Sequence, residues 1–568
     1  MEPSSAVQTI ADILAELVEK HPEKVGFKYI GDDGSETCLT YSELWIKARH
    51  FAHQWSNAKP ATRRIAICMP SGLEFVTGIY ACLLGGFTAV PLTPPIRKDF
   101  VQRCALTVAD SQPDLIVTVP ALLNLLKQIA PSTDILSIED CAFSERLPAD
   151  RYVPVANKAD IAVLQYTSAT GAGTAKGVML SQVNILHNLA AIQRCMNLST
   201  KSKMASWLPP YHVMQFIGSV LLPVYGKFPS ILMSPQRFRA QPVEWLRMIS
   251  REGATISGGP CQAFDLCVQR ISDEELKGVD LNKWTVCYCG SEPVNPAALD
   301  RFAFKFKPYG FRKDSFFPCY GLAESTLIVA GRDHRDRYKV VHADRVSLEK
   351  GVLKPVAETN GNVKAIVSCG KPCAGVDLKI VDPRSGVMLN AGSIGEIYAR
   401  SPSVGRGYWN RRELTQEVFG TATQGETETT FLKTGDLGCI LDQELYVTGR
   451  LNDLIIIWAR KLHPEDLEAC AAASNPVNGE SRTLVAADEE SSNPGVIVLQ
   501  EIDPDSSENL DSKASDIRRR LRTEFDIGVS RVAFIPRDSL PVTVTGKIRR
   551  KEAAARFVSG ELPVIQVC

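Results

Sequence analysis

The sequence has no excess of either charge. Its 64 Lys and Arg residues equal its 64 Asp and Glu residues, so the formal net charge is zero. Proteins that bind nucleic acids or anionic membranes usually carry a basic excess, because it attracts phosphate groups. We therefore expect no nucleic-acid partner.

Paired cysteine motifs are also absent. The 16 cysteines form no Cys-x-x-Cys pair, and Cys287 and Cys289 are too close together to clamp one metal easily. Structural zinc sites depend on such pairs. Free buried thiols in a reducing compartment explain the cysteines better. Because Met1 to Ala6 also lacks the positive region of a secretory signal, we predict a cytoplasmic protein.

No long hydrophobic run is free of helix breakers. The best candidate for a membrane span, Phe75 to Ile96, contains three glycines and three prolines. Gly85-Gly86 can end a helix, and Ala89 to Leu92 can form a strand. A helix followed by a strand explains this run better than a membrane span, so we expect none.

The length and composition fit a globular protein. The chain has 568 residues, of which 45% are apolar and 23% charged. A chain of this length usually forms about three to five folding units. The apolar content is sufficient to build a core, so disorder is not expected to dominate.

Residues 10 to about 330 alternate short apolar runs with segments of helical periodicity. The helical segments are Phe75 to Leu84 and Val243 to Arg251. The runs that read as buried parallel strands are Ile65–Cys68, Ala89–Val90, Asp114–Val117 and Ser230–Met233. This alternation predicts an α/β protein with helices on both faces of a sheet.

The rest of the chain reads differently. From about 363 to 449 strand signals dominate, as in Val376–Val381 and Gly395–Arg400, and we expect Gly425 to Thr430 to form a polar loop. After Arg450 the pattern predicts a compact α+β unit. Its expected elements are strands at Leu454–Ile457, Thr483–Ala487, Val496–Leu499 and Val532–Ile535, and helices at His463–Ala473 and around Ile517, Leu521 and Phe525.

One loop has the composition of a phosphate-binding segment. Leu164 to Val178 places Thr, Ser and Gly residues after an apolar run and ends near Lys176. Small residues let backbone amides approach phosphate oxygens, and hydroxyls and a lysine add donors. It is not a GxxxxGK[ST] loop, because Gly177 follows Lys176. Alone, the segment could equally be a glycine-rich surface loop.

Four further motifs follow in order. They are Ser206-Trp-Leu-Pro-Pro-Tyr-His212, Phe317-Pro-Cys-Tyr-Gly-Leu-Ala-Glu324, Lys433-Thr-Gly-Asp436 with Thr448-Gly-Arg450, and Pro541-Val-Thr-Val-Thr-Gly-Lys547. Together with the first loop they resemble the adenylate-forming superfamily of acyl-CoA synthetases, peptide-synthetase adenylation domains and luciferases. The resemblance extends from about Ile10 to Phe557.

Within that superfamily the chain is most similar to the fatty acyl-AMP ligases. The segments that carry this likeness are Ser206–Pro209, Ala254–Pro260, Gly290–Pro293, Phe317–Glu324 and Val367–Gly370. The long interval from Glu324 to Gly370 is also similar, since these ligases carry an extra segment here that is thought to hinder the domain rotation needed for CoA thioesterification.

The resemblance implies a two-step reaction with ATP and Mg²⁺ as cofactors. A medium- or long-chain fatty acid would attack the α-phosphate and give acyl-AMP and pyrophosphate. The acyl group would then pass to the phosphopantetheine thiol of an acyl carrier protein, supplied in trans, in lipid, polyketide or lipopeptide synthesis. Because two anions must meet, the site has to neutralise phosphate charge.

The resemblance also implies a two-domain fold. A large domain, residues 1–450, would combine two α/β sheet layers with the β-rich subdomain at about 363–449. A small mobile α+β domain, residues 451–568, would carry the catalytic lysine, and Leu451-Asn452-Asp453 is the hinge candidate. Exchange of its faces would let Lys547 act in the first step only.

Residue roles follow motif by motif. The resemblance implies catalytic roles for Lys547, Glu324 and His212. It also implies that Glu324 and Thr167 bind Mg²⁺. Nucleotide contacts fall to Thr167, Ser168, Thr170, Lys176, Gly290, Ser291, Glu292, Tyr320, Gly321, Asp436 and Arg450. The acyl-site wall falls to Trp207, Tyr211, Gly258, Gly259 and Pro260. A carboxylate such as Asp436 suits the ribose diol, because it offers two acceptor oxygens.

Plainer interpretations remain for several of these residues. Glu324 could interact with a helix N-terminus, Tyr320 could be a buried core residue, and Lys547 could be a solvated tail lysine. The aromatic residues around His212 could form a core cluster.

Three segments depart from the family patterns. Ala175 replaces a proline, and Lys176 lies nine residues after Thr167 instead of eight, so one residue is inserted. Val213 and Gln215 stand where fatty acyl-AMP ligases have Asp and Gly, and Trp458-Ala459 replaces the usual Arg-Gly. These changes keep two rival functions open: an acyl-CoA, aryl or amino-acid ligase, and a non-catalytic acyl- or nucleotide-binding protein.

Overall fold

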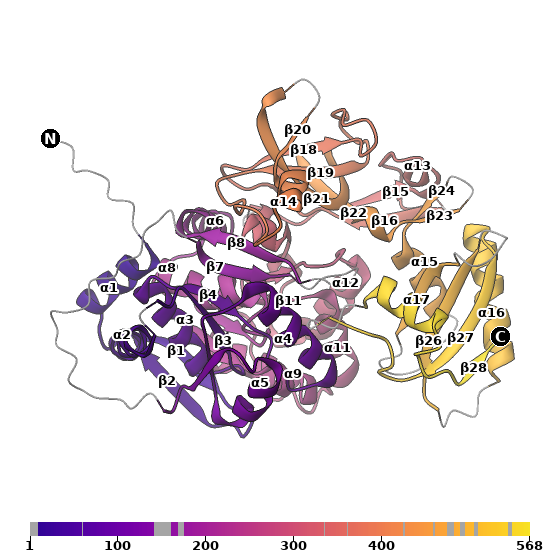
Figure 1. The fold of residues 1–568 in the computed structure, drawn as a ribbon. Helices are drawn as coiled ribbons and strands as arrows, with labels where there is room; N and C mark the ends of the chain where they lie inside the picture. The colour runs from indigo at the N-terminus through magenta and orange to yellow at the C-terminus, as the bar shows by residue number, and fades with distance from the viewer. Residues whose placement is uncertain are drawn as a thin grey trace.

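The computed structural model describes most of the chain and shows a large domain with a small domain beside it (Figure 1). The described residues are 9–59, 61–140, 161–167, 175–333, 336–360, 362–423, 426–457, 460–473, 482–488, 495–504, 509–543 and 548–568. The large domain contains two α/β sheets and an antiparallel β-rich part, as the sequence predicts.

The first sheet runs, among the described residues, in the strand order β17-β14-β13-β12-β11-β9-β10-β1-β2. Its centre from β1 to β13 is parallel, and β2, β14 and β17 join antiparallel at the edges. The strands are β1 (Val25–Ile30), β2 (Glu36–Thr40), β9 (Met204–Ser206), β10 (Ser230–Met233), β11 (Ile256–Gly259), β12 (Val286–Cys289), β13 (Phe316–Gly321), β14 (Ile328–Gly331) and β17 (Lys371–Pro372).

The second sheet has the order β6-β5-β3-β4-β7-β8 within the described ranges. It is parallel except for the β7–β8 pair. The strands are β3 (Arg64–Cys68), β4 (Thr88–Pro91), β5 (Leu115–Thr118), β6 (Asp134–Ser137), β7 (Ile161–Tyr166) and β8 (Gly177–Ser181). Alternate residues of β3 face opposite cores, Ile65 and Ile67 toward the main core and Ala66 and Cys68 toward a second one.

Helix α3 (Leu73–Gly85) contacts strands of both sheets and is buried at every position from Leu73 to Leu84 except Glu74. A helix that is apolar on all sides is stable only when it is enclosed. This enclosure explains the apolar run that begins at Phe75. The left-handed Gly86 ends the helix and β4 follows, as predicted. Within the described ranges no helix combines the length and apolarity that crossing a bilayer requires.

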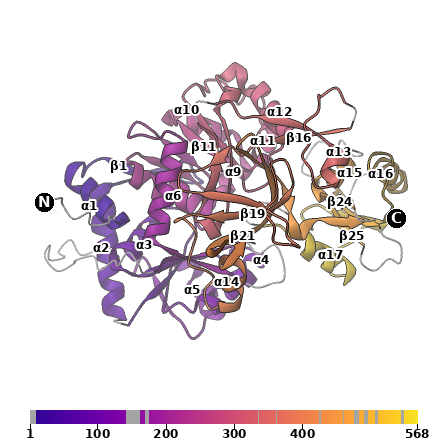
Figure 2. The same ribbon diagram turned by 90° about the horizontal axis from the view of Figure 1, so that it is seen from above.

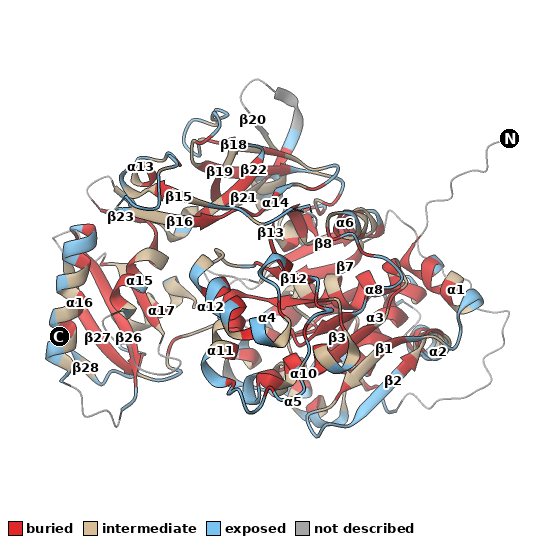
Figure 3. Ribbon diagram, turned by 180° about the vertical axis from the view of Figure 1, so that it is seen from behind, coloured by how far each residue is buried: buried red, intermediate tan, exposed pale blue. Residues whose placement is uncertain are grey.

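Most of the other helices cover the outer faces of the two sheets (Figure 2), whereas α6 (Gln182–Cys195) contacts β14 of the first sheet and β8 of the second. Burial follows this layering, since the strands are largely buried and the outer helices are exposed on one side (Figure 3). Besides α3 and α6, the helices of this part of the chain are α1 (Ile10–Lys20), α2 (Tyr41–Ala58), α4 (Lys98–Ser111), α5 (Leu123–Ile129), α7 (Val213–Gln215), α8 (Leu222–Gly226), α9 (Pro235–Ala240), α10 (Val243–Glu252), α11 (Cys261–Arg270) and α12 (Pro296–Phe306).

The β-rich part is an antiparallel sheet ordered β18-β19-β21-β20, with β22 on β21. The elements are β18 (Asp377–Val381), β19 (Gly395–Arg400), α14 (Arg412–Phe419), β20 (Thr421–Thr423), β21 (Glu426–Leu441) and β22 (Glu444–Arg450). The expected polar loop at Gly425 to Thr430 is wrong from Glu426 onward, because these residues begin β21 and pair with β20. β-Branched threonines favour extended backbone even where the segment is polar throughout.

The small domain has its own hydrophobic core, which includes Ile517, Leu521 and Phe525 on one helix face. Its main sheet is ordered β25-β26-β27-β28 among described residues. The elements are β23 (Ile455–Ile457), β24 (Arg460–Leu462), α15 (Pro464–Ala472), β25 (Thr483–Ala487), β26 (Val496–Ile502), α16 (Leu510–Phe525), β27 (Val529–Pro536), α17 (Arg550–Val558) and β28 (Gln566–Val567). The predicted strands and helices of this domain are confirmed.

After β14, the described part of the interval between Glu324 and Gly370 contains an antiparallel strand pair, β15 (Val340–Asp344) and β16 (Val363–Val367), with helix α13 (Arg345–Glu349) between the two strands in sequence. This segment contacts the small domain through ion pairs. Glu349 Oε2 lies 2.8 Å from Arg460 Nε, and Lys364 Nζ lies 2.8 Å from Asp466 Oδ2. The large domain therefore meets the small domain at a polar interface.

Candidate active site

Two cavities share Tyr320 and Arg450 in their walls. The smaller measures about 100 Å³ and is lined mainly by residues of β13, β16 and β22. The larger measures about 770 Å³ and extends from the end of β7 to the hinge candidate. Of the predicted nucleotide residues, the smaller cavity is lined by Ser291, Glu292, Tyr320, Gly321, Asp436 and Arg450. The larger is lined by Thr167, Lys176, Ser291, Tyr320, Gly321, Glu324 and Arg450.

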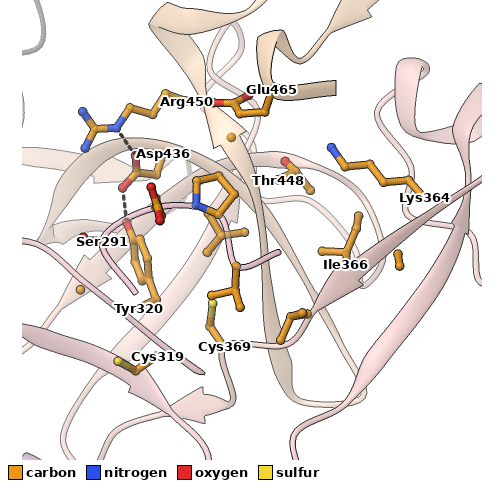
Figure 4. Close-up of a pocket in the computed structure, with 18 residues that line it drawn as sticks. Ser291, Cys319, Tyr320, Lys364, Ile366, Cys369, Asp436, Thr448, Arg450 and Glu465 are labelled. Atoms are coloured by element: carbon orange, nitrogen blue, oxygen red, sulfur yellow. Dashed lines mark hydrogen bonds and ion pairs between the residues drawn. The ribbon is translucent and has the colours of Figure 1, made fainter. Parts of the chain in front are cut away.

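Asp436 lies at the centre of a buried hydrogen-bond network (Figure 4). Arg450 Nε donates to its Oδ1 at 2.9 Å, and the Tyr320 hydroxyl donates to its Oδ2 at 2.8 Å. Asp436 and Arg450 are partners across the β21–β22 pair, which explains their spacing in the sequence. Burial raises the pKa of Tyr320, so its hydroxyl remains a donor. Each carboxylate oxygen keeps a lone pair for a further donor.

The turn before Asp436 is held by a residue that the motifs do not include. Gly435 has a φ of +71°, which favours glycine, and its amide donates to Glu396 Oε1 at 3.1 Å. The Thr434 hydroxyl accepts from the Asp436 amide at 3.1 Å. Burial raises the pKa of Glu396. Glu396 thus fixes the backbone that presents the Asp436 carboxylate.

Replacement of Asp436 by asparagine is expected to raise the KM for ATP about 10- to 100-fold, because a charged hydrogen bond contributes roughly 1.5–3 kcal/mol. The isosteric amide retains the fold around Tyr320. Initial rates of pyrophosphate release over a range of ATP concentrations measure this. Asp377→Asn is the control, since Asp377 pairs with Arg400 at 2.9 Å on the exposed side of the same sheet. An unchanged KM in Asp436→Asn would contradict the nucleotide role.

Glu324 lies in the short 3₁₀ turn Ala323–Ser325, opposite Tyr408. The Tyr408 hydroxyl donates to Glu324 Oε1 at 2.7 Å. Lys176 Nζ lies 5.4 Å from the centre of the Tyr408 ring. Thr167 is bound to the same loop, because its amide donates to the Lys176 carbonyl at 3.2 Å. Ser168 and Thr170 lie outside the described residues.

His212 lines the larger cavity and begins α7. Its Nδ1 accepts a hydrogen bond from the Met214 amide at 3.3 Å. Burial lowers the pKa of His212 to about 4, so the ring is neutral near pH 7. With Nδ1 as acceptor, the ring proton lies on Nε2. Neighbouring Tyr211 accepts from Gln165 through its backbone carbonyl at 3.1 Å.

Buried histidines predict a loss of stability in acid. Burial also lowers the pKa of His463 to about 4, beside Lys364 and Asp466. Between the unfolded value of about 6.5 and pH 4 the unfolded chain binds more protons, so the free energy of unfolding falls as the pH falls. Urea midpoints at pH 7.5, 5.5 and 4.5 measure this fall. It is expected to be smaller in His463→Gln and unchanged in the control His21→Gln, at an exposed position.

Trp207 lies in an aromatic cluster and is not among the residues that line the two cavities described above. Its ring stacks on Phe238 with centroids 3.8 Å apart and meets Trp245 edge-on. A Cβ on Gly259 would lie 3.0 Å from Trp207 Cζ2, and one on Gly258 would lie 2.0 Å from the Tyr288 carbonyl oxygen. These glycines therefore allow close packing one layer behind the cavity, as does Pro260 at the start of α11. Tyr288 itself lines the cavity.

Close packing also explains two predicted glycines near the nucleotide residues. A Cβ on Gly321 would lie 1.7 Å from the Leu327 carbonyl oxygen, and one on Gly290 would lie 2.7 Å from the Cys319 carbonyl oxygen. Neither position has room for a side chain. Gly290 precedes Ser291, so it lets β12 and β13 bring Ser291 beside Tyr320.

Many residues that line the larger cavity are apolar or small. They include Ile192, Met196, Met204, Val213, Met214, Gly218, Leu222, Tyr288, Leu327 and Ile328. Most of these residues were missed in the sequence, because helical apolar residues look alike whether they face a core or a cavity. Of the two unusual residues, Val213 lines the cavity and buried Gln215 accepts a hydrogen bond from Ser206.

Lys547 lies outside the described residues, and so does Trp458-Ala459. Of the described residues nearest to it in sequence, Thr543 and Lys551 line the larger cavity. Val542 and Ile548 form an antiparallel backbone bridge.

Comparison with known proteins identifies the family. The profile of the AMP-binding enzymes matches residues 14–409. The medium-chain-fatty-acid–[acyl-carrier-protein] ligase JamA of Moorena producens is 33% identical over 570 residues, covering 98% of this chain and 96% of the relative.

Two solved structures agree in fold and in length. A fatty acyl-adenylate ligase from work on the E. coli and L. pneumophila enzymes is 28% identical, with a TM-score of 0.88 and 98% of both chains covered. The L. pneumophila fatty acyl-adenylate ligase, in complex with acyl adenylate and pyrophosphate, is 30% identical, with a TM-score of 0.77 and coverage of 99% and 98%. The chain therefore belongs to the AMP-binding enzymes and, within the adenylate-forming superfamily, is a fatty acyl-AMP ligase.

Proposed function

We propose that the enzyme activates a medium- or long-chain fatty acid and delivers it to an acyl carrier protein. A carboxylate oxygen attacks the α-phosphorus of ATP, the bond to the β-phosphate oxygen breaks, and pyrophosphate leaves. The phosphopantetheine sulfur of the carrier then attacks the acyl carbonyl carbon, and AMP leaves. The carrier comes in trans, and the reaction takes place in the cytoplasm.

The single observation that supports this proposal most is the larger cavity. Its lining combines the polar residues Thr167, Lys176 and Glu324 with a set of apolar residues. A volume of about 770 Å³ is suited to an acyl chain together with a polar head. His212 lines the same cavity, and its neutral imidazole can donate a hydrogen bond from Nε2 to the acid without forming an ion pair with it.

The nucleotide assignments start from the Asp436 carboxylate, which is buried and keeps acceptor oxygens for the ribose. We assign the ribose hydroxyls to Asp436, the adenine to Tyr320 with Gly290, Ser291, Glu292 and Gly321, and the phosphates to Thr167, Ser168, Thr170 and Lys176. Arg450 holds Asp436 in place and adds positive charge. The JamA relative, a fatty-acid–[acyl-carrier-protein] ligase, supports the choice of acid and acceptor.

The donor set also suits Mg²⁺. Glu324 and Thr167 present a carboxylate and a hydroxyl oxygen to one cavity, which a hard cation prefers. Among the described residues, no group of three or more His, Cys, Asp or Glu side chains is placed to hold a metal. Bound with ATP, Mg²⁺ would neutralise phosphate charge. The protein's part is to orient Glu324.

We propose Arg450 as the end of the large domain and Leu451–Asp453, which forms a 3₁₀ turn, as the hinge. Lys547 would bridge the attacking carboxylate and the α-phosphate from the small domain. The ion pairs of Glu349 and Lys364 with the small domain support a restraint on its rotation. A restrained rotation agrees with a carrier protein as the acceptor in place of free CoA.

The test is pyrophosphate release and product analysis with a panel of acids. Purified enzyme is given ATP and saturated fatty acids from six to sixteen carbons, benzoate or phenylalanine, with CoA or with a phosphopantetheinylated carrier protein. We expect release with the fatty acids, acyl transfer to the carrier and little acyl-CoA. Acyl-CoA as the main product, or turnover with the aryl or amino acids alone, would favour the rival ligases. ATP binding without turnover would favour a non-catalytic protein.

A further inference from the structure

Tyr408 lies between two residues with proposed phosphate-side roles, and no motif assigns it a function. Its hydroxyl donates to Glu324 Oε1 at 2.7 Å, and its ring lies 5.4 Å from Lys176 Nζ. All three side chains line the larger cavity. One aromatic side chain thus contacts both the carboxylate assigned to the metal and the lysine assigned to the phosphates.

The backbone around Tyr408 ties these two groups together. The segment 405–409 runs antiparallel beside β8, with a bridge between Val178 and Tyr408. The Met179 amide donates to the Gly407 carbonyl at 2.9 Å, and the Trp409 amide donates to the Gly177 carbonyl at 2.8 Å. β8 begins directly after Lys176, so this added strand fixes the exit of the phosphate loop.

The same segment also holds the Glu324 turn and Tyr408 itself. The Gly405 amide donates to the Glu324 carbonyl at 2.8 Å. The Tyr408 amide donates to the Thr415 hydroxyl at 2.9 Å. The position of the ring is therefore set by hydrogen bonds on both sides of it.

We propose that Tyr408 is a positioning residue that orients the Glu324 carboxylate toward magnesium-bound ATP with its hydroxyl and holds Lys176 beside the phosphates with its ring. The proposal rests on the proposed metal role of Glu324. It also accounts for the insertion before Lys176. The Tyr408 ring belongs to a different segment of the chain, so its cation–π contact can position the Lys176 ammonium group even with one more residue before Lys176.

The two contacts can be separated by mutation. Tyr408→Phe removes only the hydroxyl, so Glu324 loses its donor while Lys176 keeps the ring. Tyr408→Leu removes both. Binding of a non-hydrolysable ATP analogue, measured by titration calorimetry with and without Mg²⁺, gives two readouts that do not depend on turnover.

We expect Mg²⁺ to strengthen analogue binding to the wild-type enzyme. In Tyr408→Phe this gain is expected to fall about tenfold, because a charged hydrogen bond is lost, with the magnesium-free affinity unchanged. In Tyr408→Leu the magnesium-free affinity is also expected to fall, about threefold, because Lys176 loses its cation–π contact. Pyrophosphate release should show the same split, with a higher magnesium requirement in Tyr408→Phe.

The matched control is Tyr309→Phe. Tyr309 also donates to a carboxylate, Asp273, at 3.3 Å, but on the exposed surface of the large domain. The Tyr309→Phe variant should bind the ATP analogue with the wild-type affinity, both with and without Mg²⁺. In the background Glu324→Gln, Tyr408→Phe should change the magnesium gain no further, because its partner is already altered.

An unchanged magnesium gain in folded Tyr408→Phe overturns the proposal, and so does an equal loss with and without Mg²⁺. If Tyr408→Phe fails to fold, Glu324→Gln decides: retention of the full magnesium gain overturns the proposal. Failure of the proposed function is distinguishable, since it appears as wild-type enzyme that binds the analogue with Mg²⁺ but releases no pyrophosphate with any fatty acid.

Discussion

Replacing Lys547 by alanine is expected to lower the rate of acyl-AMP formation about 100- to 1,000-fold, because one preorganised cation at the reacting phosphate contributes that much to transition-state stabilisation. ATP binding should hardly change, since the lysine acts where charge develops and not on the ground state. Pyrophosphate release with a saturating fatty acid measures the loss. Calorimetric binding of an ATP analogue measures the retained affinity.

Transfer of the acyl group from acyl-AMP to the carrier protein distinguishes a specific role of Lys547 in adenylation from a general loss of enzyme structure. Acyl-AMP supplied ready-made should still be transferred to the carrier protein by Lys547→Ala, because the lysine is proposed to act in the first step alone. Lys277→Ala serves as the control, since Lys277 pairs with Glu274 on the surface with 77% of its side chain exposed. Equal loss of both half-reactions, or full adenylation by Lys547→Ala, would contradict the proposed role.

Replacing Gly218 by leucine is expected to shift the acid preference toward shorter chains by about 100-fold. Gly218 is one of the residues that line the larger cavity, and a Cβ there would have only Leu327 Cδ2 within 4 Å, at 3.9 Å. The new side chain would therefore enter the space of the acyl chain. Excluding about four methylenes at ~0.8 kcal/mol each removes roughly 3 kcal/mol of binding, or about two orders of magnitude.

The measurement is kcat/KM for pyrophosphate release with saturated acids of six to sixteen carbons. Short acids should react as with the wild type, and the loss should grow with length until the chain no longer fits. Gly528→Leu is the matched control, because Gly528 is exposed in the small domain with nothing within 4 Å of a Cβ. A uniform loss across all lengths would contradict the assignment of this wall to the acyl chain.

Local pattern was sufficient to predict many elements of the fold. Ser230–Met233, Gly395–Arg400 and Thr483–Ala487 were predicted with the bounds that β10, β19 and β25 have in the structure. Short apolar or alternating runs bounded by turn residues leave few alternatives. The strand order could not be predicted, since β9 is hydrogen-bonded between β10 and β11 by contacts distant in sequence.

The candidate site also contains residues that local sequence predicts and residues that only long-range contacts reveal. Asp436 and Arg450 are 14 residues apart on one hairpin, so a motif can contain both. Tyr408 meets Glu324 across 84 residues, and Glu396 meets Gly435 across 39. A lone tyrosine or glutamate in a strand or loop has no local signal for such a partner. Trp207 and Gly258 do not line the larger cavity themselves, and Gly258 packs against Tyr288, which does. Their predicted roles in acid binding stay predictions.

The wall of the smaller cavity comes from both domains. Lys364 on β16 belongs to the large domain and Glu465 on α15 to the small one, and both line it beside Tyr320 and Asp436. Lys364 is also paired with Asp466, at 2.8 Å. A rotation of the small domain about the proposed hinge Leu451–Asp453 would therefore remove one wall of this cavity. If AMP binds there as proposed, the movement that admits the carrier's thiol would also open an exit for AMP, and acceptor entry would be coupled to product release.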